Sequence, residues 1–305
     1  MKIHYELGRE LGAPPLVAAI GFFDGMHRGH REIARQVFRL RKTGWSAAVL
    51  TFSNHPASFL RPGTEPPLIC TPEERVDLFA KAGYDECYFV TFDETIAQTS
   101  AGEFVLDILI NRLRVQGVVV GSNFRFGHKR QGDVPLMRKL LSDVGVPLVA
   151  VDNIADADGR ISSSRIRTLI SEGKCGEADE LLGHSYEIRE RVVLGEGRGH
   201  DLGFPTANIE PPHKLLPPDG VYSAIARHDG RDYASLVSIG TNPTFGGKRR
   251  TVEAWLRDFR GTIYGEELAL RSFRFVREQR KYGTIEALLR QMHADTEAVA
   301  YPSYG

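Results

Sequence analysis

Two histidines that flank a glycine are the residues whose types and spacing first suggest chemistry. His27 and His30 lie in the string Gly-Phe-Phe-Asp-Gly-Met-His-Arg-Gly-His at 21–30. At this spacing both imidazoles can point at one polyphosphate and donate hydrogen bonds to charge that develops on an α-phosphate and on a pyrophosphate leaving group. An incoming phosphate is already ionised, so such a transfer needs no general base. His27 and His30 are therefore candidate catalytic residues for nucleotidyl transfer.

The segments around this string are those expected of a phosphate site. A nearly continuous apolar run over 16–23 predicts a buried strand, and apolar residues at 33, 37 and 40 predict a helix after the string. Glycines let the backbone approach a ligand, and a helix start offers unpaired N–H groups and a positive dipole end. The alternative is a glycine-rich turn with two solvent-facing histidines. The residues expected to contact the polyphosphate are Gly21, Phe22, Phe23, Asp24, Gly25 and Gly29.

Two later strings add polar groups that suit the same site. The serines at 162–164 can cap a helix or bind phosphate, and an arginine after them can clamp a polyphosphate. The aromatic stretch at 123–126 can hold a planar ring, although its phenylalanines also suit a strand core. The predicted phosphate ligands are Ser162, Ser164 and Arg165, and the predicted ring-binding residues are Asn123, Phe124 and Arg125.

A second set of candidates lies in the C-terminal part of the chain. Thr206 and Asn208 belong to the string 199–208, and a hydroxyl and an amide oxygen are suitable hard ligands for Mg²⁺. Taken alone, this string is typical of a turn before a polar strand. Glu253 lies in an apolar strand-like run, where a glutamate taken alone is usually a surface charge.

The elements that must position these residues change in pattern along the chain. Up to about residue 180, apolar runs alternate with amphipathic segments, including capping boxes at 71–74 and 100–103, and this βαβα order predicts a parallel sheet. From 184 onwards, short strands separated by Gly/Pro turns predict an antiparallel barrel or sandwich, closed by a helix over 284–299. We therefore expect domains at 1–183 and 184–305. Predicted strands span 47–52, 117–121, 147–151, 186–194, 221–227, 234–239, 251–256 and 268–275.

Composition excludes several classes of protein. Lys plus Arg and Asp plus Glu both number 39, so the zero net charge argues against a nucleic-acid-binding protein. The three cysteines are far apart and indicate free thiols rather than disulfides or a zinc site. The charged N-terminus and the absence of a long apolar run indicate neither a signal peptide nor a membrane span. We expect a cytoplasmic protein.

The strings at 21–30 and 199–208 resemble those of bacterial bifunctional riboflavin kinase/FAD synthetases, whose first domain is a Rossmann-like HIGH-type nucleotidyltransferase. The resemblance implies that the first domain adenylylates FMN to FAD and that a C-terminal β-barrel phosphorylates riboflavin to FMN. ATP and Mg²⁺ would serve both steps. The oligomeric state stays open. Matching strings continue in order at 51–56, 120–127, 132–133, 161–167, 218–222, 239–245 and 250–253.

The resemblance also assigns roles in the second domain. It makes Glu253 the general base that takes a proton from the ribityl 5′-hydroxyl as this oxygen attacks the γ-phosphate. It assigns Thr206 and Asn208 to Mg-ATP and Arg277 to the flavin. In the first domain it assigns Asn123, Phe124 and Arg125 to the flavin, with an adenine as the alternative ring. The chain departs from the family at Trp255, where a histidine is usual. Further departures are Thr262, where an acidic residue is usual, and Tyr282, where a phenylalanine is usual.

These departures leave alternatives open. One is a monofunctional adenylyl- or cytidylyltransferase with a degenerate second domain, which a riboflavin kinase assay distinguishes. Another is a flavin-binding regulatory protein without turnover, against which the intact His27, His30, Asn208 and Glu253 argue. A nucleic-acid-binding module is disfavoured by the balanced charge.

Overall fold

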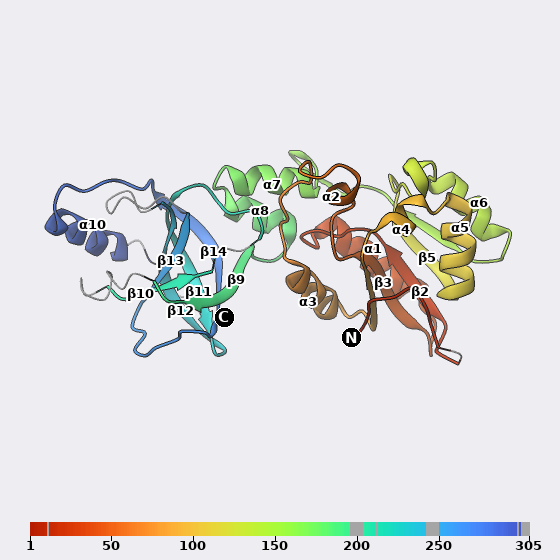
Figure 1. The fold of residues 1–305 in the computed structure, drawn as a ribbon, viewed down its shortest axis with the longest axis horizontal. Helices are drawn as coiled ribbons and strands as arrows, with labels where there is room; N and C mark the ends of the chain where they lie inside the picture. Colours follow the sequence, from red (N-terminus) through yellow and green to blue (C-terminus); the bar gives the residue numbers. More distant parts are fainter. Residues whose placement is uncertain (11, 196–203, 211–212, 242–249, 298, 300–305) are drawn as a thin grey trace. The chain divides into compact units, whose positions relative to one another are not determined.

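The computed structural model describes residues 1–10, 12–195, 204–210, 213–241, 250–297 and 299 (Figure 1). The strings at 199–203 and 242–245 lie outside these residues. The chain divides into two compact units, Met1–Ser163 and Ser164–Gly305. Helices α7 (Ser163–Ser171) and α8 (Cys175–Leu182) precede the boundary at 183/184 that the sequence suggested, and α8 packs on a barrel strand of the second unit. The boundary between the functional domains stays a prediction.

The first unit is built on the predicted parallel sheet. Its strands run in the order β1-β4-β3-β2-β5-β6, and every neighbouring pair is parallel. The chain passes from β2 through β3 to β4 on one side and later resumes at β5 on the other. Open sheets of this kind bind ligands beyond the carboxyl ends of the strands where the order reverses, here β2 and β5. The strands are β1 (Lys2–His4), β2 (Leu16–Ile20), β3 (Ser46–Phe52), β4 (Glu86–Val90), β5 (Val115–Gly121) and β6 (Leu148–Val151).

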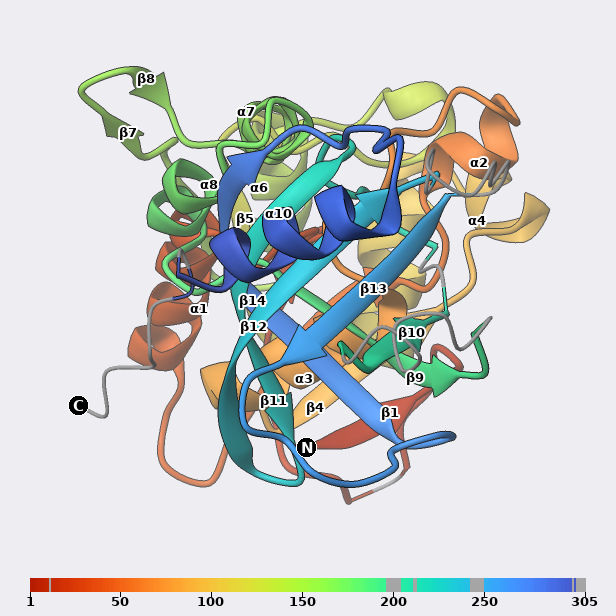
Figure 2. The same ribbon diagram turned by 90° about the vertical axis from the view of Figure 1, so that its left-hand side faces the viewer.

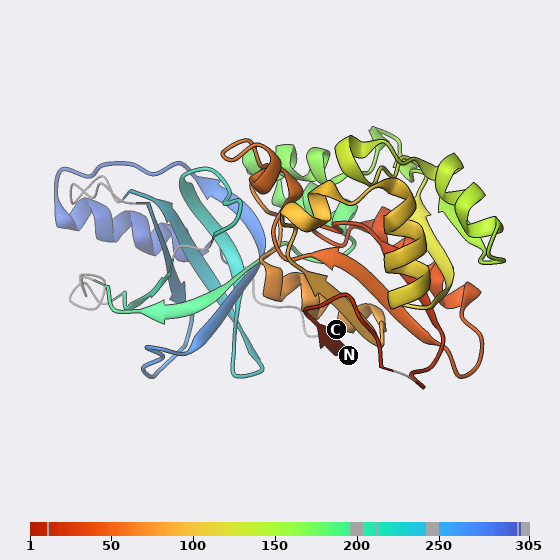
Figure 3. The same cartoon turned by 45° about the vertical axis from the view of Figure 1, so that its right-hand side comes forward.

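Helices cover both faces of this sheet, as the apolar run of β2 requires. Leu16, Ala18 and Ile20 belong to one core cluster, whereas Val17 and Ala19 belong to another. The first cluster includes residues of η1 (Phe104–Arg112) and α6 (Val134–Ser142), and the second includes residues of α1 (Arg28–Leu40) and α3 (Pro72–Ala82). Figure 3 shows η1, in yellow, across one face of the sheet.

Local capping accounts for where several helices begin. The capping box predicted at Thr71 and Glu74 is present before α3, and the one at Ser100 and Glu103 is present before α5 (Ala101–Glu103). Each box satisfies two N–H groups that a helix start leaves without partners. The helix that begins at the second box continues from α5 into η1, which has π-helical hydrogen bonding. The other short elements are α2 (Pro56–Leu60), α4 (Glu94–Gln98), η2 (His128–Arg130), β7 (Ala155–Asp156) and β8 (Gly159–Arg160).

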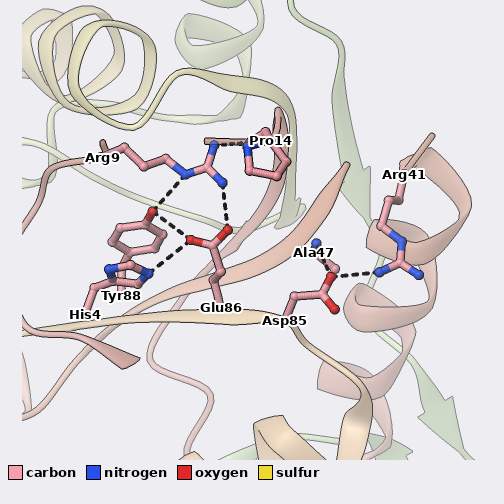
Figure 4. Close-up of polar contacts among 8 residues, drawn as sticks. All are labelled: His4, Arg9, Pro14, Arg41, Ala47, Asp85, Glu86 and Tyr88. Carbon is pink, nitrogen blue, oxygen red and sulfur yellow. Dashed lines mark hydrogen bonds and ion pairs between the residues drawn. The ribbon is translucent and has the colours of Figure 1, made fainter. Parts of the chain in front are cut away.

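A polar network attaches the edge strand β1, which the sequence did not predict (Figure 4). Glu86 on β4 accepts hydrogen bonds from Arg9 at 2.7 Å and from Tyr88 at 3.1 Å, and lies 3.0 Å from His4 Nε2. The rings of His4 and Tyr88 stack with centroids 4.5 Å apart. Nearby, Asp85 accepts from Arg41 and from the Ala47 amide. These contacts lie at the start of β4, away from the ligand-binding edge of the sheet.

The second unit contains a closed antiparallel barrel, which decides between the barrel and the sandwich that the sequence left open. Its strand order is β10-β13-β12-β11-β14-β9, and the predicted terminal helix is α10 (Ile285–Glu297). In Figure 2, α10 crosses the barrel strands. β10, which carries Thr206 and Asn208, is the polar strand that the string at 199–208 indicates when taken alone. The strands are β9 (Glu187–Val193), β10 (Thr206–Ile209), β11 (Gly220–His228), β12 (Arg231–Gly240), β13 (Thr251–Leu256) and β14 (Glu267–Arg277).

The described residues also bear on membrane insertion and on the chemistry of the cysteines. Among the described residues, no helix combines the length and apolarity that a membrane crossing requires. Cys70, Cys87 and Cys175 are buried free thiols. Burial raises the pKa of both the Cys87 and the Cys175 thiols to about 12, so these thiols are inert.

Candidate functional site

The loop between β2 and α1 places the two predicted histidines at the start of a helix. His27 is the N-cap of α1, and its Nδ1 accepts a hydrogen bond from the backbone N–H of His30 at 3.3 Å. This contact puts the ring proton of a neutral His27 on Nε2. The two imidazoles stack with centroids 3.6 Å apart and planes inclined by 18°. The structure therefore brings His27 and His30 together at the positive end of α1.

The conformation of this loop is unusual, and side-chain packing holds it in place. Phe23 has a φ of +56° and Met26 a φ of +39°, both in the left-handed region that disfavours non-glycine residues. Such residues cost about 1–3 kcal/mol each and persist where the surroundings over-determine them. The buried Phe23 ring makes edge contacts with Phe79 and His30. A Cβ at Gly29 would lie 3.0 Å from the His27 ring, so a side chain at this position would crowd the imidazole.

The electrostatics of the pair favour uncharged donors. Burial, and then the charge of His27, lower the pKa of His30 well below its ordinary value of 6.5. His30 is therefore neutral at pH 7. Its buried Nδ1 has no hydrogen-bond partner among the described residues. A polar ring atom in this position, next to the N–H groups of a helix start, suits a phosphate oxygen.

Asp24 has a structural task that differs from the predicted phosphate contact. Its buried carboxylate accepts hydrogen bonds from the backbone N–H groups of Ile69 and Cys70, each at 3.1 Å. The Asp24 carbonyl accepts from the Ser163 hydroxyl at 2.9 Å. These contacts show that Asp24 holds the loop, and its contact with a bound nucleotide stays a prediction. Gly25 has a φ of +79°, which suits a glycine in the tight turn after Asp24.

The residues predicted to bind a ring follow β5, on the other side of the switch point. Asn123 and Arg125 are exposed and Phe124 is half-buried, with its ring parallel to that of the buried Phe126 at 5.8 Å. Arg125 forms an ion pair with Asp133 at 3.3 Å. The Asn123 side chain has no hydrogen-bond partner among the described residues. Phe126 is therefore core, and Asn123 and Phe124 are presented at the carboxyl edge of the sheet.

The serine string is tied to the loop of Asp24 by a serine that was not predicted as a phosphate ligand. It is Ser163, between the predicted Ser162 and Ser164, whose hydroxyl ties the string to the carbonyl of Asp24. Ser162 is half-buried before α7, Ser164 is exposed in its first turn, and Arg165 is half-buried on the same helix. A phosphate role for Ser162, Ser164 and Arg165 stays a prediction.

Strand register brings the predicted residues of the second unit together. Asn208 on β10 lies directly opposite Glu253 on β13, and Thr206 lies directly opposite Trp255. Side chains at such paired positions of antiparallel strands point to the same face, with Cβ atoms about 5 Å apart. On the other side of β13, Ser238 of β12 also pairs with Glu253. The side chains of Asn208, Ser238 and Glu253 therefore share one half-buried face of the barrel with Thr206.

Neighbouring contacts hold this face in order. The Thr251 hydroxyl lies 3.2 Å from Oε1 of Glu253, and Gln279 donates to the Ser238 hydroxyl at 2.9 Å. The Trp255 ring packs near Phe204 at 5.9 Å, and Phe204 contacts His293 of α10 edge-on at 4.8 Å. Trp255 thus supports Phe204, which lies two residues before Thr206. This packing is a structural role for the residue that departs from the family pattern.

Arg277, predicted to bind the flavin, is engaged in a buried ion pair. Its Nε lies 3.0 Å from both carboxylate oxygens of Asp295, and its Nη2 lies 2.6 Å from Oδ2. Gln291 also donates to Asp295 at 2.8 Å. Only 5% of the Asp295 side chain is exposed. The structure therefore shows Arg277 holding α10 on β14, and its contact with a flavin stays a prediction.

Sequence reasoning missed several residues at these sites. Arg75 hydrogen-bonds to the carbonyls of Phe22 and Phe52, and Thr51 hydrogen-bonds to that of Phe22. Arg75 follows Glu74 on an amphipathic helix, where a charged pair is normally solvated, so no local signal marks it. Ser238 and Gln279 join the barrel face through pairing between distant strands, which a single sequence does not reveal.

Comparison with protein families agrees with the two-part organisation. A family model described as FAD synthetase matches residues 12–165, and one described as riboflavin kinase matches residues 182–301. The first match ends with the serine string, and the second covers the barrel and α10. The candidate residues of the first unit and the serine string lie within the first match, and those of the barrel lie within the second.

Individual proteins match over nearly the full length. The bifunctional riboflavin kinase/FMN adenylyltransferase of Listeria monocytogenes is 35% identical over 92% of this chain and 90% of its own length. The protein of the same name from Bacillus subtilis is 34% identical over 93% and 92%. A crystal structure titled macrolide-efflux protein, from Streptococcus pneumoniae, is 28% identical with a TM-score of 0.86, covering 98% of this chain and 99% of that one.

Proposed function

The chain belongs to the family of bifunctional riboflavin kinase/FMN adenylyltransferases, and from this premise we propose which of its residues carry out each reaction. The enzyme phosphorylates riboflavin to FMN and adenylylates FMN to FAD. We assign adenylyl transfer to the carboxyl edge of the sheet in the first unit and phosphoryl transfer to the face of the barrel that carries Glu253.

In adenylyl transfer, the ionised phosphate of FMN attacks the α-phosphate of ATP and pyrophosphate leaves. His27 and the neutral His30, together with the N–H groups at the start of α1, donate hydrogen bonds to the phosphate oxygens as charge builds on them. The stacked rings and the unpartnered Nδ1 of His30 support this assignment. The backbone around Gly21, Phe22, Phe23, Gly25 and Gly29 would line the phosphate path, with Ser162, Ser164 and Arg165 as further ligands.

In phosphoryl transfer, the Glu253 carboxylate accepts the proton of the ribityl 5′-hydroxyl, and the resulting oxygen nucleophile attacks the γ-phosphate of ATP. A neutral alcohol needs this base, whereas the phosphate acceptor of the other reaction does not. The Thr251 hydroxyl beside Oε1 helps to orient the carboxylate. The observation that carries the assignment is the direct pairing of Glu253 with Asn208.

The same face fits a magnesium ion bound together with ATP. Thr206 and Asn208 offer a hydroxyl and an amide oxygen on one strand, two residues apart. Mg²⁺ keeps several waters and phosphate oxygens, so two hard protein ligands suffice. A Cβ at Gly195 would lie 2.0 Å from the Asn208 amide nitrogen, so the chain closes tightly around this side chain. When bound, the ion would neutralise charge on the transferred phosphate.

We place the flavin of the first unit against Asn123, Phe124 and Arg125, beyond the carboxyl end of β5. Exposed polar and half-buried aromatic groups there can contact both the edge and the face of a ring system. We further propose that the functional domains are 1–183 and 184–305, with Arg277 close to the flavin of the kinase. The three free thiols are consistent with a cytoplasmic enzyme.

The test is to incubate the purified chain with riboflavin, ATP and Mg²⁺ and to separate the flavins over time. FMN should appear first and FAD should follow, and neither should form in the presence of a magnesium chelator. FAD formed from added FMN but nothing formed from riboflavin would indicate an impaired kinase, with Trp255 and Thr262 as the first positions to change. Failure to convert either flavin would contradict the proposal.

A further inference from the structure

Arg75 is a buried cation at the carboxyl edge of the sheet, next to the adenylyl-transfer site. It lies on α3, directly after the glutamate of the capping box, and only 1% of it is exposed. Charged side chains are seldom buried this completely. All the hydrogen bonds of its guanidinium in the described part of the chain go to backbone carbonyls. The position therefore calls for a physical explanation.

The guanidinium spans the ends of two neighbouring strands. Its Nη1 donates to the Phe22 carbonyl at 2.9 Å, just beyond β2, and its Nη2 donates to the Phe52 carbonyl at 2.7 Å, at the end of β3. The Thr51 hydroxyl donates to the same Phe22 carbonyl at 3.1 Å. A planar group with several fixed donors can bridge such carbonyls, whereas an ammonium group offers only a point charge.

The Phe22 side chain is held as well as its backbone. The Arg75 Cζ lies 4.2 Å from the centroid of the Phe22 ring and 5.2 Å from that of Phe89, both within the range of cation–π attraction. His55 contacts the Phe22 ring edge-on, with centroids 4.7 Å apart. Phe22 is therefore fixed at its carbonyl by two donors and at its ring by a cation and an imidazole.

Burial of the Arg75 charge is costly for the stability of the fold, which suggests that the residue has another role. Burial lowers the pKa of Arg75, and the Asp24 carboxylate is the largest influence that opposes this shift. Taking a charged group out of water carries a large free-energy penalty. The residue after Phe22 is the strained Phe23, and the loop then leads to His27. A rigid clamp at Phe22 keeps this unusual loop in one conformation.

We propose that Arg75 is a positioning residue for adenylyl transfer, which sets the placement of His27 and His30 by clamping Phe22 to the end of β3. The proposal rests on the function assigned above to the two histidines. A misplacement of about 1 Å typically costs about 100-fold in rate. Because the clamp acts on residues that stabilise the transition state, its loss should lower kcat more than it raises KM.

The experiment compares Arg75→Met, Arg75→Lys and the control Arg138→Met in the full-length chain. Arg138 also donates to a backbone carbonyl, that of Leu148 at 3.1 Å, but at the start of β6. For each variant, kcat and KM of FMN adenylylation, kcat of riboflavin phosphorylation and the melting temperature are measured. We expect Arg75→Met to lose about 100-fold in kcat for adenylylation and Arg75→Lys about tenfold, with KM values within about threefold.

The other measurements separate positioning from folding. Riboflavin phosphorylation should stay within about twofold in all variants, and Arg138→Met should keep full adenylylation. An unchanged kcat in folded Arg75→Lys and Arg75→Met, with only a lower melting temperature, would overturn the proposal in favour of a purely structural arginine. If Arg75→Met does not fold, an unchanged kcat in Arg75→Lys alone overturns it. A wild-type chain that does not adenylylate FMN would instead contradict the proposed function.

Discussion

The imidazole rings of His27 and His30 stack on one another, with centroids 3.6 Å apart and planes inclined by 18°. Two protonated rings at this distance would repel each other, and burial already disfavours charge on His30. The site therefore presents the neutral ring of His30 and the positive end of α1 to a polyanion. Charge complementarity with ATP then comes from dipoles that are in place before the substrate arrives, which is the condition for strong transition-state stabilisation.

The depressed pKa of His30 should make the first unit sensitive to acid. The unfolded chain binds a proton at His30 near pH 6.5, before the folded chain does, so stability is retained above this pH and falls as the pH drops towards the folded pKa. His30→Gln should weaken this dependence. The measurement uses a Trp255→Phe background, in which Trp45 is the only remaining tryptophan. The fluorescence of Trp45 then reports urea unfolding of the first unit. If the free energy of unfolding changed with pH by the same slope between pH 8 and 5 in the chains with and without His30, this expectation would be contradicted.

Asp179 should have the opposite dependence in the second unit. Burial raises its pKa to about 6, against hydrogen bonds from the Tyr186 amide and the Ser185 side chain. Since the folded pKa is the higher one, its contribution to stability is complete below pH 3.8 and is lost as the pH rises through about 6. Asp179→Asn should therefore stabilise the unit at pH 7.5 by about 2–3 kcal/mol and lose this advantage in acid.

The reporter for this measurement is Trp255 in a Trp45→Phe background. Glu180→Gln is the matched control, because it removes an exposed carboxylate from the same helix. A pH-independent effect of Asp179→Asn, or the same effect in the control, would show that the buried carboxylate is not responsible.

The ion pair between Arg277 and Asp295 should be essential to the attachment of α10. Removing one partner leaves the other charge buried, which typically costs about 3–5 kcal/mol. Asp295→Ala should destabilise the barrel unit by an amount in this range, whereas Arg277→Met combined with Asp295→Leu should recover most of the loss. Urea unfolding followed through Trp255 checks both. A double variant no more stable than the single one would argue against a simple charge pair.

The sequence predicted the elements whose causes are local. The apolar run at β2, the helix α1 and the two capping boxes depend on residues close together in the chain, and the structure confirms them. β1, Lys-Ile-His, was missed because it is too short to show a pattern and owes its structure to pairing with β4. β4 was also missed, although its run Cys-Tyr-Phe-Val is an apolar strand signal of the kind used for β2.

The residues of the candidate sites divide in the same way, into those that local sequence places and those that the tertiary fold places. His27 and His30 are three residues apart on one helix turn, so their meeting follows from the sequence. The pairing of Asn208 with Glu253 spans 45 residues and depends on barrel register. Arg75 and Asp24 could not be interpreted from sequence, because the direction of a buried charged side chain is decided by the carbonyls or N–H groups that the tertiary fold brings to it.

The central claim is that one chain holds two separate sites, and reciprocal variants test it most directly. His30→Ala and Glu253→Gln are each supplied with riboflavin and, separately, with FMN, and initial rates of both reactions are measured. We expect His30→Ala to lose at least about 100-fold in FAD formation while riboflavin phosphorylation stays within about twofold, and Glu253→Gln to show the reverse. Loss of both activities together in either folded variant would contradict the two-site assignment.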